Sequence, residues 1–299
     1  MTKGRVLTRM LTASQRLFAA MKTPRAQRIS WAVAVVIFFG GLAASIASQP
    51  QLISSFRAGP ALIIIALLCP AMTIINMATT RETAQLAGVS MGFSAALKLA
   101  VMSAAANHLP APGGPILRTA VIQAAGGTLK NAGLANVASG FAWMSATFLF
   151  VSAWALALDA RLAAALLLLG AVLLACTFAI TRSLPGGHAS AIRLLLISLV
   201  SAAAYAVSIY VALNAFGSAW PFSHAAVIAA SGVIGAASSI APSGLGVREI
   251  AAAGLATLIG ADPATAFTAT ATVHIAMAAF TGAVSLYFFI RGEARTQTA

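Results

Sequence analysis

The sequence predicts an all-α polytopic membrane protein. Of its 299 residues, 60% are hydrophobic and only 8% are charged, whereas water-soluble domains carry roughly 25% charged residues. The apolar residues gather in long runs, and most of these runs are near the length of about 20 residues that a helix needs to cross the hydrocarbon core of a bilayer. No polar stretch is long enough to form a soluble catalytic domain.

Apolar runs follow one another along the chain, and each is expected to form a helix. Their bounds are 30–48, 60–78, 91–107, 116–128, 133–158, 161–180, 194–213, 223–240, 250–260 and 265–290. The runs 116–128 and 250–260 hold only 13 and 11 residues, which is too short to span a bilayer at 1.5 Å of rise per residue.

Each short run follows an interruption of the same form. Residues 112–118 and 242–248, which begin 130 residues apart, both read Pro-x-Gly-x-x-x-Arg. A helix broken by Pro and Gly with an arginine at the break is costly in a bilayer, and a duplicated break indicates a substrate site between internal repeats. The sequence therefore predicts two repeats, around 91–128 and 223–260.

The distribution of basic loops favours re-entrant hairpins. We expect each short run to return to the side from which the preceding run came, because most basic loops then lie in the cytoplasm, as the positive-inside rule requires. The cytoplasmic groups would be the N-terminus, Arg81, Lys130, Arg182, Arg193, Arg291 and Arg295, with Arg57 and Arg161 outside. This arrangement has about six full spans plus two oppositely directed re-entrant helical hairpins; eight spans fit the run lengths almost as well, and that alternative stays open.

Three parts follow along the chain: a basic N-terminal segment (1–29), one transmembrane domain (30–290) and a short tail (291–299). The net charge is +13, and residues 1–28 hold seven basic residues and no acid. We expect a cytoplasmic segment that touches anionic lipid head groups rather than nucleic acid. The expected location is the bacterial plasma (inner) membrane, with both termini cytoplasmic.

Arg248 is the first candidate for binding substrate. It stands where the helix of 250–260 begins, and the N–H groups of a helix start attract anions. Its guanidinium offers a forked pair of donors that suits phosphate, and Gly244 and Gly246 let a ligand approach the backbone. Glu249 favours the same helix end through the dipole, although an intramembrane acid can also couple protons.

The first break repeats this arrangement with Gly114 and Arg118. Two arginines could grip one phosphodiester; alternatively, they bond carbonyls that the breaks leave free. Asn107, His108 and Lys98 are further candidates to line a polar cavity. His274, within the last run, is expected more as a satisfied hydrogen-bond partner than as a proton relay. Four scattered histidines, two cysteines and no nucleotide-binding loop predict no metal, no cofactor and no enzyme activity.

The string at 238–249, with its Pro-x-Gly-x-Gly-x-Arg-Glu core, resembles the transmembrane region of lysylphosphatidylglycerol synthases, also called a flippase domain. Residues 107–114 together with Arg118 resemble the same family, and the similarity extends over about 30–290. The resemblance implies a helical bundle that moves a lipid between leaflets. In bifunctional members a soluble domain attaches an amino acid to phosphatidylglycerol. Here we expect a stand-alone member without the synthase domain, because the chain ends nine residues after the last run.

The expected function is therefore that of a lipid flippase whose substrate carries a phosphate held by Arg118 and Arg248. A proton-coupled transporter of small solutes is one alternative, and a non-transporting accessory subunit of a lipid-modifying enzyme is another. The expected partner is a membrane phospholipid or lipid-linked substrate, and a homodimer remains open.

Overall fold

The computed structural model describes residues 24–108, 113–217, 220–238 and 242–296. Most of the basic segment (1–23), Pro112 of the first motif and the last three residues of the tail lie outside these ranges. The structure is 86% helical, with no strand among the described residues. Each of the apolar runs lies within or overlaps a helix, which confirms the all-α fold.

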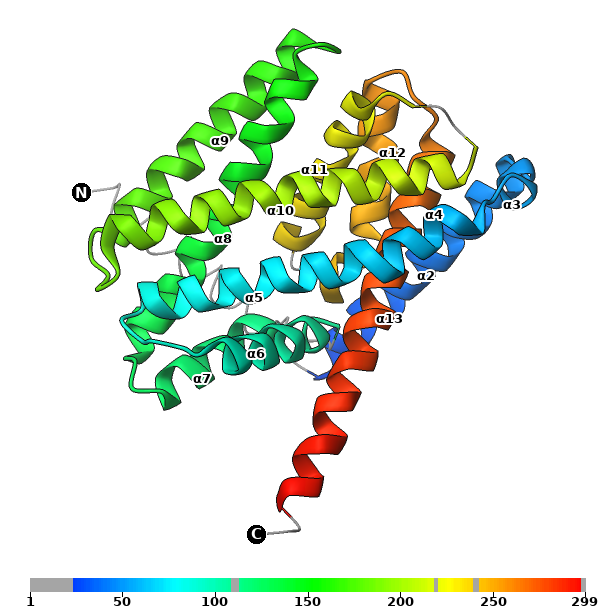
Figure 1. Cartoon of the computed structure of the whole chain (residues 1–299). Helices are drawn as coiled ribbons and strands as arrows, with labels where there is room; N and C mark the ends of the chain where they lie inside the picture. Colours follow the sequence, from blue (N-terminus) through cyan, green and yellow to red (C-terminus); the bar gives the residue numbers. More distant parts are fainter. Residues whose placement is uncertain (1–23, 109–112, 218–219, 239–241, 297–299) are drawn as a thin grey trace.

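The helices follow the predicted runs closely (Figure 1). In chain order they are α2 (Pro24–Ser48), α3 (Gln51–Ser54), α4 (Ala58–Ile63), the π-helix η1 (Ile64–Leu68), α5 (Cys69–Leu86), α6 (Phe93–Ala106), α7 (Gly113–Ala124), α8 (Leu129–Ala155), α9 (Ala160–Thr181), α10 (Gly187–Ala215), α11 (Phe222–Ser238), the 3-10 turn η2 (Pro242–Gly244), α12 (Val247–Leu258) and α13 (Pro263–Thr296).

Among the described residues, five helical segments are long and apolar enough to cross a membrane, in agreement with a multi-pass membrane protein. They are Ala58–Leu86, Leu129–Ala155, Ala160–Thr181, Gly187–Ala215 and Pro263–Arg291. The remaining predicted span, 30–48, corresponds to the 17-residue apolar part of α2, Ala32–Ser48. Whether the shorter helices cross the bilayer or return stays a prediction.

Polar side chains close the helix starts between spans. Asp159 accepts hydrogen bonds from the backbone N–H groups of Arg161 (2.7 Å) and Leu162 (3.0 Å) at the start of α9. These bonds, that of Leu162 foremost, hold the pKa of the Asp159 carboxyl below its ordinary value. Asp262 caps α13 in the same way and also accepts a bond from Gln49 Nε2 at 2.8 Å.

One expected loop is helical. Arg81 lies inside α5, which continues to Leu86. The neighbouring Glu82 forms an ion pair with Arg193 on α10, with Nε and Oε2 2.9 Å apart. The expected break after residue 78 was wrong because Thr, Arg, Glu and Gln after the apolar run continue the helix on a face packed against α10.

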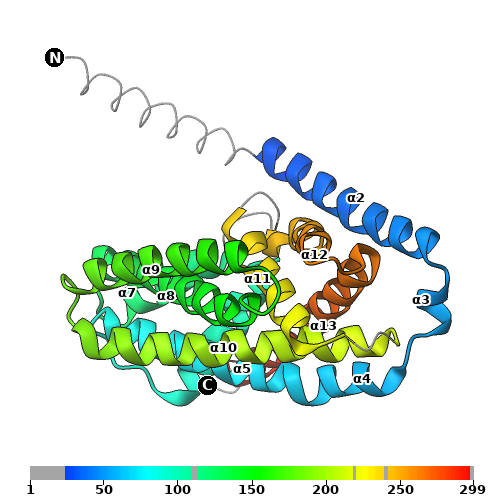
Figure 2. The same cartoon turned by 90° about the horizontal axis from the view of Figure 1, so that it is seen from above.

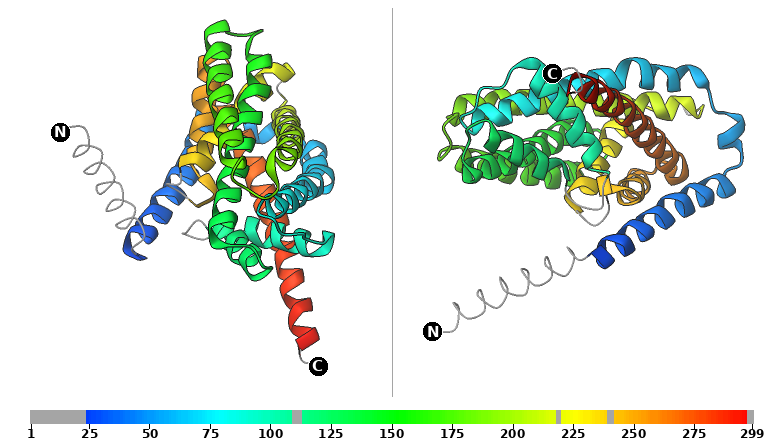
Figure 3. Two further views of the ribbon diagram at one scale, coloured as in Figure 1. Left: turned by 90° about the vertical axis from the view of Figure 1, so that its left-hand side faces the viewer. Right: turned by 90° about the horizontal axis from the view of Figure 1, so that it is seen from below.

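The two short runs fold back against the arms that precede them. α7 packs along α6, and α12 packs along α11. α13 contacts both α6 and α12 and so connects the two hairpins; Figure 1 shows them at different ends of the bundle. Figure 2 shows α2 outside the main bundle, where it contacts α12 and α13. The C-terminal part of α13 extends beyond the other helices (Figure 3).

Candidate functional site

The second break is a tight turn that only glycine can accommodate at two positions. Gly244 and Gly246 have φ of +73° and +79°, a region that side chains avoid. A Cβ on Gly244 would lie 2.6 Å from the carbonyl carbon of Gly235, and one on Gly246 would lie 2.8 Å from Ile37 Cγ2. Protein therefore fills the space beside both glycines, with α11 on one side and α2 on the other. Substrate approach at these glycines stays a prediction.

Glu249 is fully buried, with 0% of its surface exposed. Its Oε2 accepts a hydrogen bond from the backbone N–H of Gly246 at 2.7 Å, which is the bond that the glutamate of a capping box makes at a helix start. Its Oε1 lies 2.8 Å from Nδ1 of His274 on α13. The positive end of α12 thus already holds a carboxylate of its own, so this helix start is not an open anion site.

Arg248 leaves the same turn in another direction. Its Nη2 donates to the Ser243 carbonyl at 3.2 Å, and its Cζ lies 5.9 Å from the centre of the Tyr205 ring. The side chain is partly exposed. Among the described residues, its Nε, the Tyr205 hydroxyl and the Ser231 hydroxyl are buried and make no hydrogen bond of good geometry, although the Tyr205 hydroxyl lies close enough to Arg248 and Ser231 to interact with both. Two hydroxyl groups beside one guanidinium suit an anion or ordered water.

Glycines on α11 allow this approach. A Cβ on Gly235 would lie 2.8 Å from Arg248 Cβ, and one on Gly232 would lie 2.8 Å from Tyr205 Cε1. A larger residue at either position would therefore push the arginine or the tyrosine away. The placement of Arg248 depends on both the turn and the helix behind it.

The first break is held by neutral amides. The Asn107 side-chain oxygen accepts a bond from the backbone N–H of Gly114 at 3.0 Å. Gly114 is buried, and a Cβ there would collide with the Asn107 side chain. Arg118 donates from Nη2 to the side-chain oxygen of Asn76 on α5 at 2.9 Å, and its buried Nε has no partner among the described residues. Lys98 is exposed on α6.

A row of titratable side chains, not the two arginines, connects the breaks. Arg118 bonds to α5, whereas Arg248 lies against α10 and α11. His108, at the end of α6, has its ring centre 6.0 Å from that of His274, and His274 in turn contacts Glu249. His108 of the first hairpin and Glu249 of the second therefore both lie beside the same histidine of α13.

Sequence reasoning missed three polar residues of this region: Asn76, Tyr205 and Ser231. Asn76 could have been found, because an amide within an apolar run needs a partner and Arg118 is among the few available cations. Tyr205 and Ser231 carry no such signal, since single hydroxyl groups are common in apolar helices. Among the described residues, no group of three His, Cys, Asp or Glu side chains could hold a metal ion.

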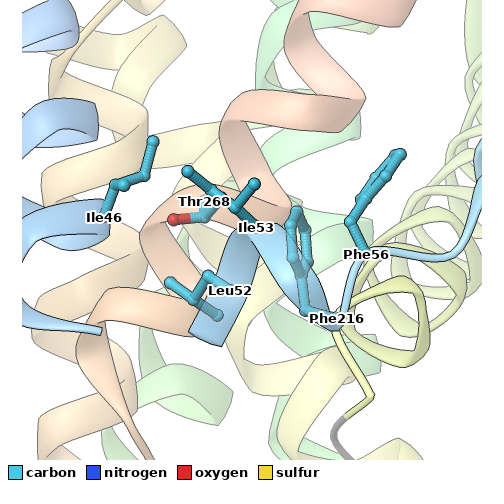
Figure 4. A pocket seen from close by; sticks show the side chains of 6 residues that line it. All are labelled: Ile46, Leu52, Ile53, Phe56, Phe216 and Thr268. Atoms are coloured by element: carbon cyan, nitrogen blue, oxygen red, sulfur yellow. The ribbon is translucent and has the colours of Figure 1, made fainter. Parts of the chain in front are cut away.

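An apolar pocket of about 260 Å³ lies elsewhere, where α3 meets α10 and α13 (Figure 4). Its lining contains one polar side chain, that of Thr268, and none of the predicted site residues. The residues are Ile46, Leu52, Ile53, Phe56, Phe216 and Thr268. The chemistry at the breaks, rather than this pocket, marks the candidate site.

Comparison with known proteins gives a match to one family. Residues 182–285 match the model of the lysylphosphatidylglycerol synthase TM region, and this segment contains the second break, Arg248, Glu249 and His274. No curated protein and no solved structure matches the chain. The match supports the predicted membership of the lysylphosphatidylglycerol synthase TM-region family over this segment, which is about a third of the chain.

Proposed function

We propose that the chain is a lipid translocase, not an enzyme, and that it moves a phosphate-bearing lipid between leaflets. The family match supports a membrane domain of a kind often linked to lipid flipping. The observation that carries the proposal is the polar group at the second break. There the partly exposed guanidinium of Arg248 lies beside two hydroxyl groups, and each of the three side chains has a buried atom that makes no hydrogen bond of good geometry among the described residues.

The head group binds through its phosphate. Arg248 donates to the phosphate oxygens from a surface of low dielectric, where charge-assisted hydrogen bonds are strong. Arg118 supplies the second cation, at the first break, and the acyl chains stay in the bilayer. The hairpins are re-entrant, and movement of one repeat against the other carries the head group across.

The proposed setting is the bacterial plasma membrane with both termini in the cytoplasm. The basic residues before α2 then face anionic lipid head groups, which attract Lys and Arg by about 1 kcal/mol each. A homodimer is compatible with this arrangement.

The test uses purified protein in vesicles that contain a phosphatidylglycerol labelled on one acyl chain. A membrane-impermeant quencher measures the fraction of label in the outer leaflet with time. We expect the double variant Arg118→Ala/Arg248→Ala to lose most of the translocation. The matched control is Arg182→Ala, which removes one cation from an exposed position and should leave the rate unchanged. A double variant as fast as the wild type would refute the role of the two arginines.

One observation favours a second function. The buried contact between Glu249 and His274 is the kind of intramembrane ionisable pair that proton-coupled solute transporters use. Uptake of a soluble organic anion into vesicles, dependent on a pH gradient and occurring without lipid movement, would favour this alternative.

A further inference from the structure

We infer that Glu249, His274 and His108 form a proton-binding site that links the two helix breaks and couples lipid translocation to a proton gradient. This inference rests on the proposed translocase function and adds a second ligand, the proton. It begins from geometry: the three side chains come from both hairpins and from the span between them.

The row leads from a partly exposed group to a fully enclosed one. His108 is partly exposed, His274 is 4% exposed, and Glu249 is 0% exposed. The two histidine rings are 6.0 Å apart between centres, and His274 Nδ1 is 2.8 Å from Glu249 Oε1. A proton that reaches His108 therefore has a second base next to it and a carboxylate beyond.

The contact between Glu249 and His274 can hold one proton or two. With one proton, the pair is a carboxylate beside a neutral imidazole, and the proton on Nδ1 is donated to Oε1. A second proton, taken from water, gives an imidazolium beside a carboxylate or, with the same number of protons, a carboxylic acid beside a neutral imidazole. The imidazolium would face His108 across the gap between the two breaks.

The groups around the Glu249–His274 pair determine the effect of the charge that a second proton adds. Among the described residues, the other charged or titratable groups that face the pair are Arg248 on α12, Tyr205 on α10 and His108 just after α6. α2 presents apolar side chains, with the Phe38 ring 6.5 Å from that of His274. A positive charge on His274 is repelled by Arg248 and by a protonated His108, so protonation favours separation of the first break from the second.

Capping alone does not require a carboxylate. The N–H of Gly246 needs one acceptor, and glutamine serves in a capping box as well as glutamate does. Burying an ionisable group is costly unless it is paired, and here the partner is another titratable side chain rather than a permanent cation. The pair is therefore suited to gaining and losing a proton.

The decisive variant is Glu249→Gln. Its side-chain oxygen can still accept the hydrogen bond from Gly246, but the site no longer titrates as a carboxylate. The matched control is Glu82→Gln, which removes a carboxylate from the ion pair with Arg193, between α5 and α10. Thermal unfolding in detergent checks that both variants remain folded.

Lipid translocation is measured in vesicles whose internal and external pH are set separately between about 5 and 8, the range in which histidine titrates. We expect an imposed proton gradient to change the wild-type rate by at least about fivefold, the lower end of usual coupling between two sites. Glu82→Gln should respond like the wild type, and Glu249→Gln should translocate at a rate independent of the gradient. A wild-type response in Glu249→Gln, or no response in a translocating wild-type protein, would overturn the inference.

A second measurement separates this inference from the proposed function. Acid–base titration of the protein in detergent counts protons bound over the same pH range without any lipid transport. We expect Glu249→Gln to bind about one proton fewer than the wild type and Glu82→Gln to match it. Equal proton uptake by wild type and Glu249→Gln would overturn the proton site, whereas a wild-type protein that binds the proton but moves no lipid would overturn the translocase instead.

Discussion

The turn at the second break offers a sharp test of how the site is built. Replacement of Gly244 by alanine places a Cβ at a residue whose φ is +73° and 2.6 Å from the carbonyl carbon of Gly235. The left-handed conformation costs a residue with a Cβ about 1–2 kcal/mol, and forcing an extra methyl group into a packed region costs about 1–3 kcal/mol. The two effects add to a loss of about 2–5 kcal/mol in the free energy of unfolding.

The matched control lies ten residues further along the same hairpin. Gly254 is exposed on α12, and nothing lies within 4 Å of a Cβ built there. Alanine should stabilise this helical position by about 0.4–1 kcal/mol. Equilibrium unfolding in mixed micelles compares the two variants with the wild type. If Gly244→Ala were as stable as Gly254→Ala, the turn geometry and its contact with Gly235 would be wrong.

Three further substitutions test other contacts. Asn76→Ala leaves Arg118 Nη2 without its acceptor and should lower the free energy of unfolding by about 1–3 kcal/mol, measured in the same micelles. Tyr205→Phe keeps the ring beside Arg248 but removes a hydroxyl that makes no hydrogen bond of good geometry, so unfolding should be unchanged while vesicle translocation falls about fivefold, as expected for one lost hydrogen bond to substrate. Asp159→Ala removes the cap of α9 and should lower the melting temperature at neutral pH. Because folding lowers the Asp159 pKa, this stabilisation is present above the unfolded pKa and is lost as pH falls below about 4.

Controls distinguish these contacts from general damage. Tyr210→Phe removes a hydroxyl one and a half turns away on α10 and should leave translocation at the wild-type rate. Asp159→Asn retains an acceptor for the helix start but does not titrate, so its melting temperature should lack the acid-dependent loss. Equal effects of Tyr205→Phe and Tyr210→Phe would argue against a substrate contact at Tyr205.

Much of the fold follows from hydrophobic patterning. Each apolar run contains or overlaps a helix, because in a bilayer the backbone must satisfy its own hydrogen bonds and the helix is the local way to do so. The two short runs fold back as hairpin arms because Pro and Gly interrupt the helix before each of them. The same interruptions made the runs recognisable in the sequence. The helix ends were harder, as Arg81 shows, because polar residues continue a helix where a neighbour packs against it.

The site was only partly predictable. Arg118, Arg248 and Glu249 were recognisable because charges are rare in this chain and stand next to breaks. Their partners were not, since residues such as Asn76 and His274 lie 42 and 25 positions away in sequence from the residues they contact. Pairing at that distance depends on how helices are arranged in three dimensions, and an apolar pattern with small residues at many positions permits many arrangements.

The groups that cap the helix starts at the two breaks differ in charge, which bears on the direction in which an anionic head group moves. The first helix start is closed by the uncharged amide of Asn107, whereas the second is closed by the carboxylate of Glu249. Arg118 bonds to the neutral amide of Asn76, whereas Arg248 shares its turn with the carboxylate of Glu249. Although the two motifs are alike in sequence, their charges differ. An anion that moves from one break to the other therefore meets a different electrostatic potential at each.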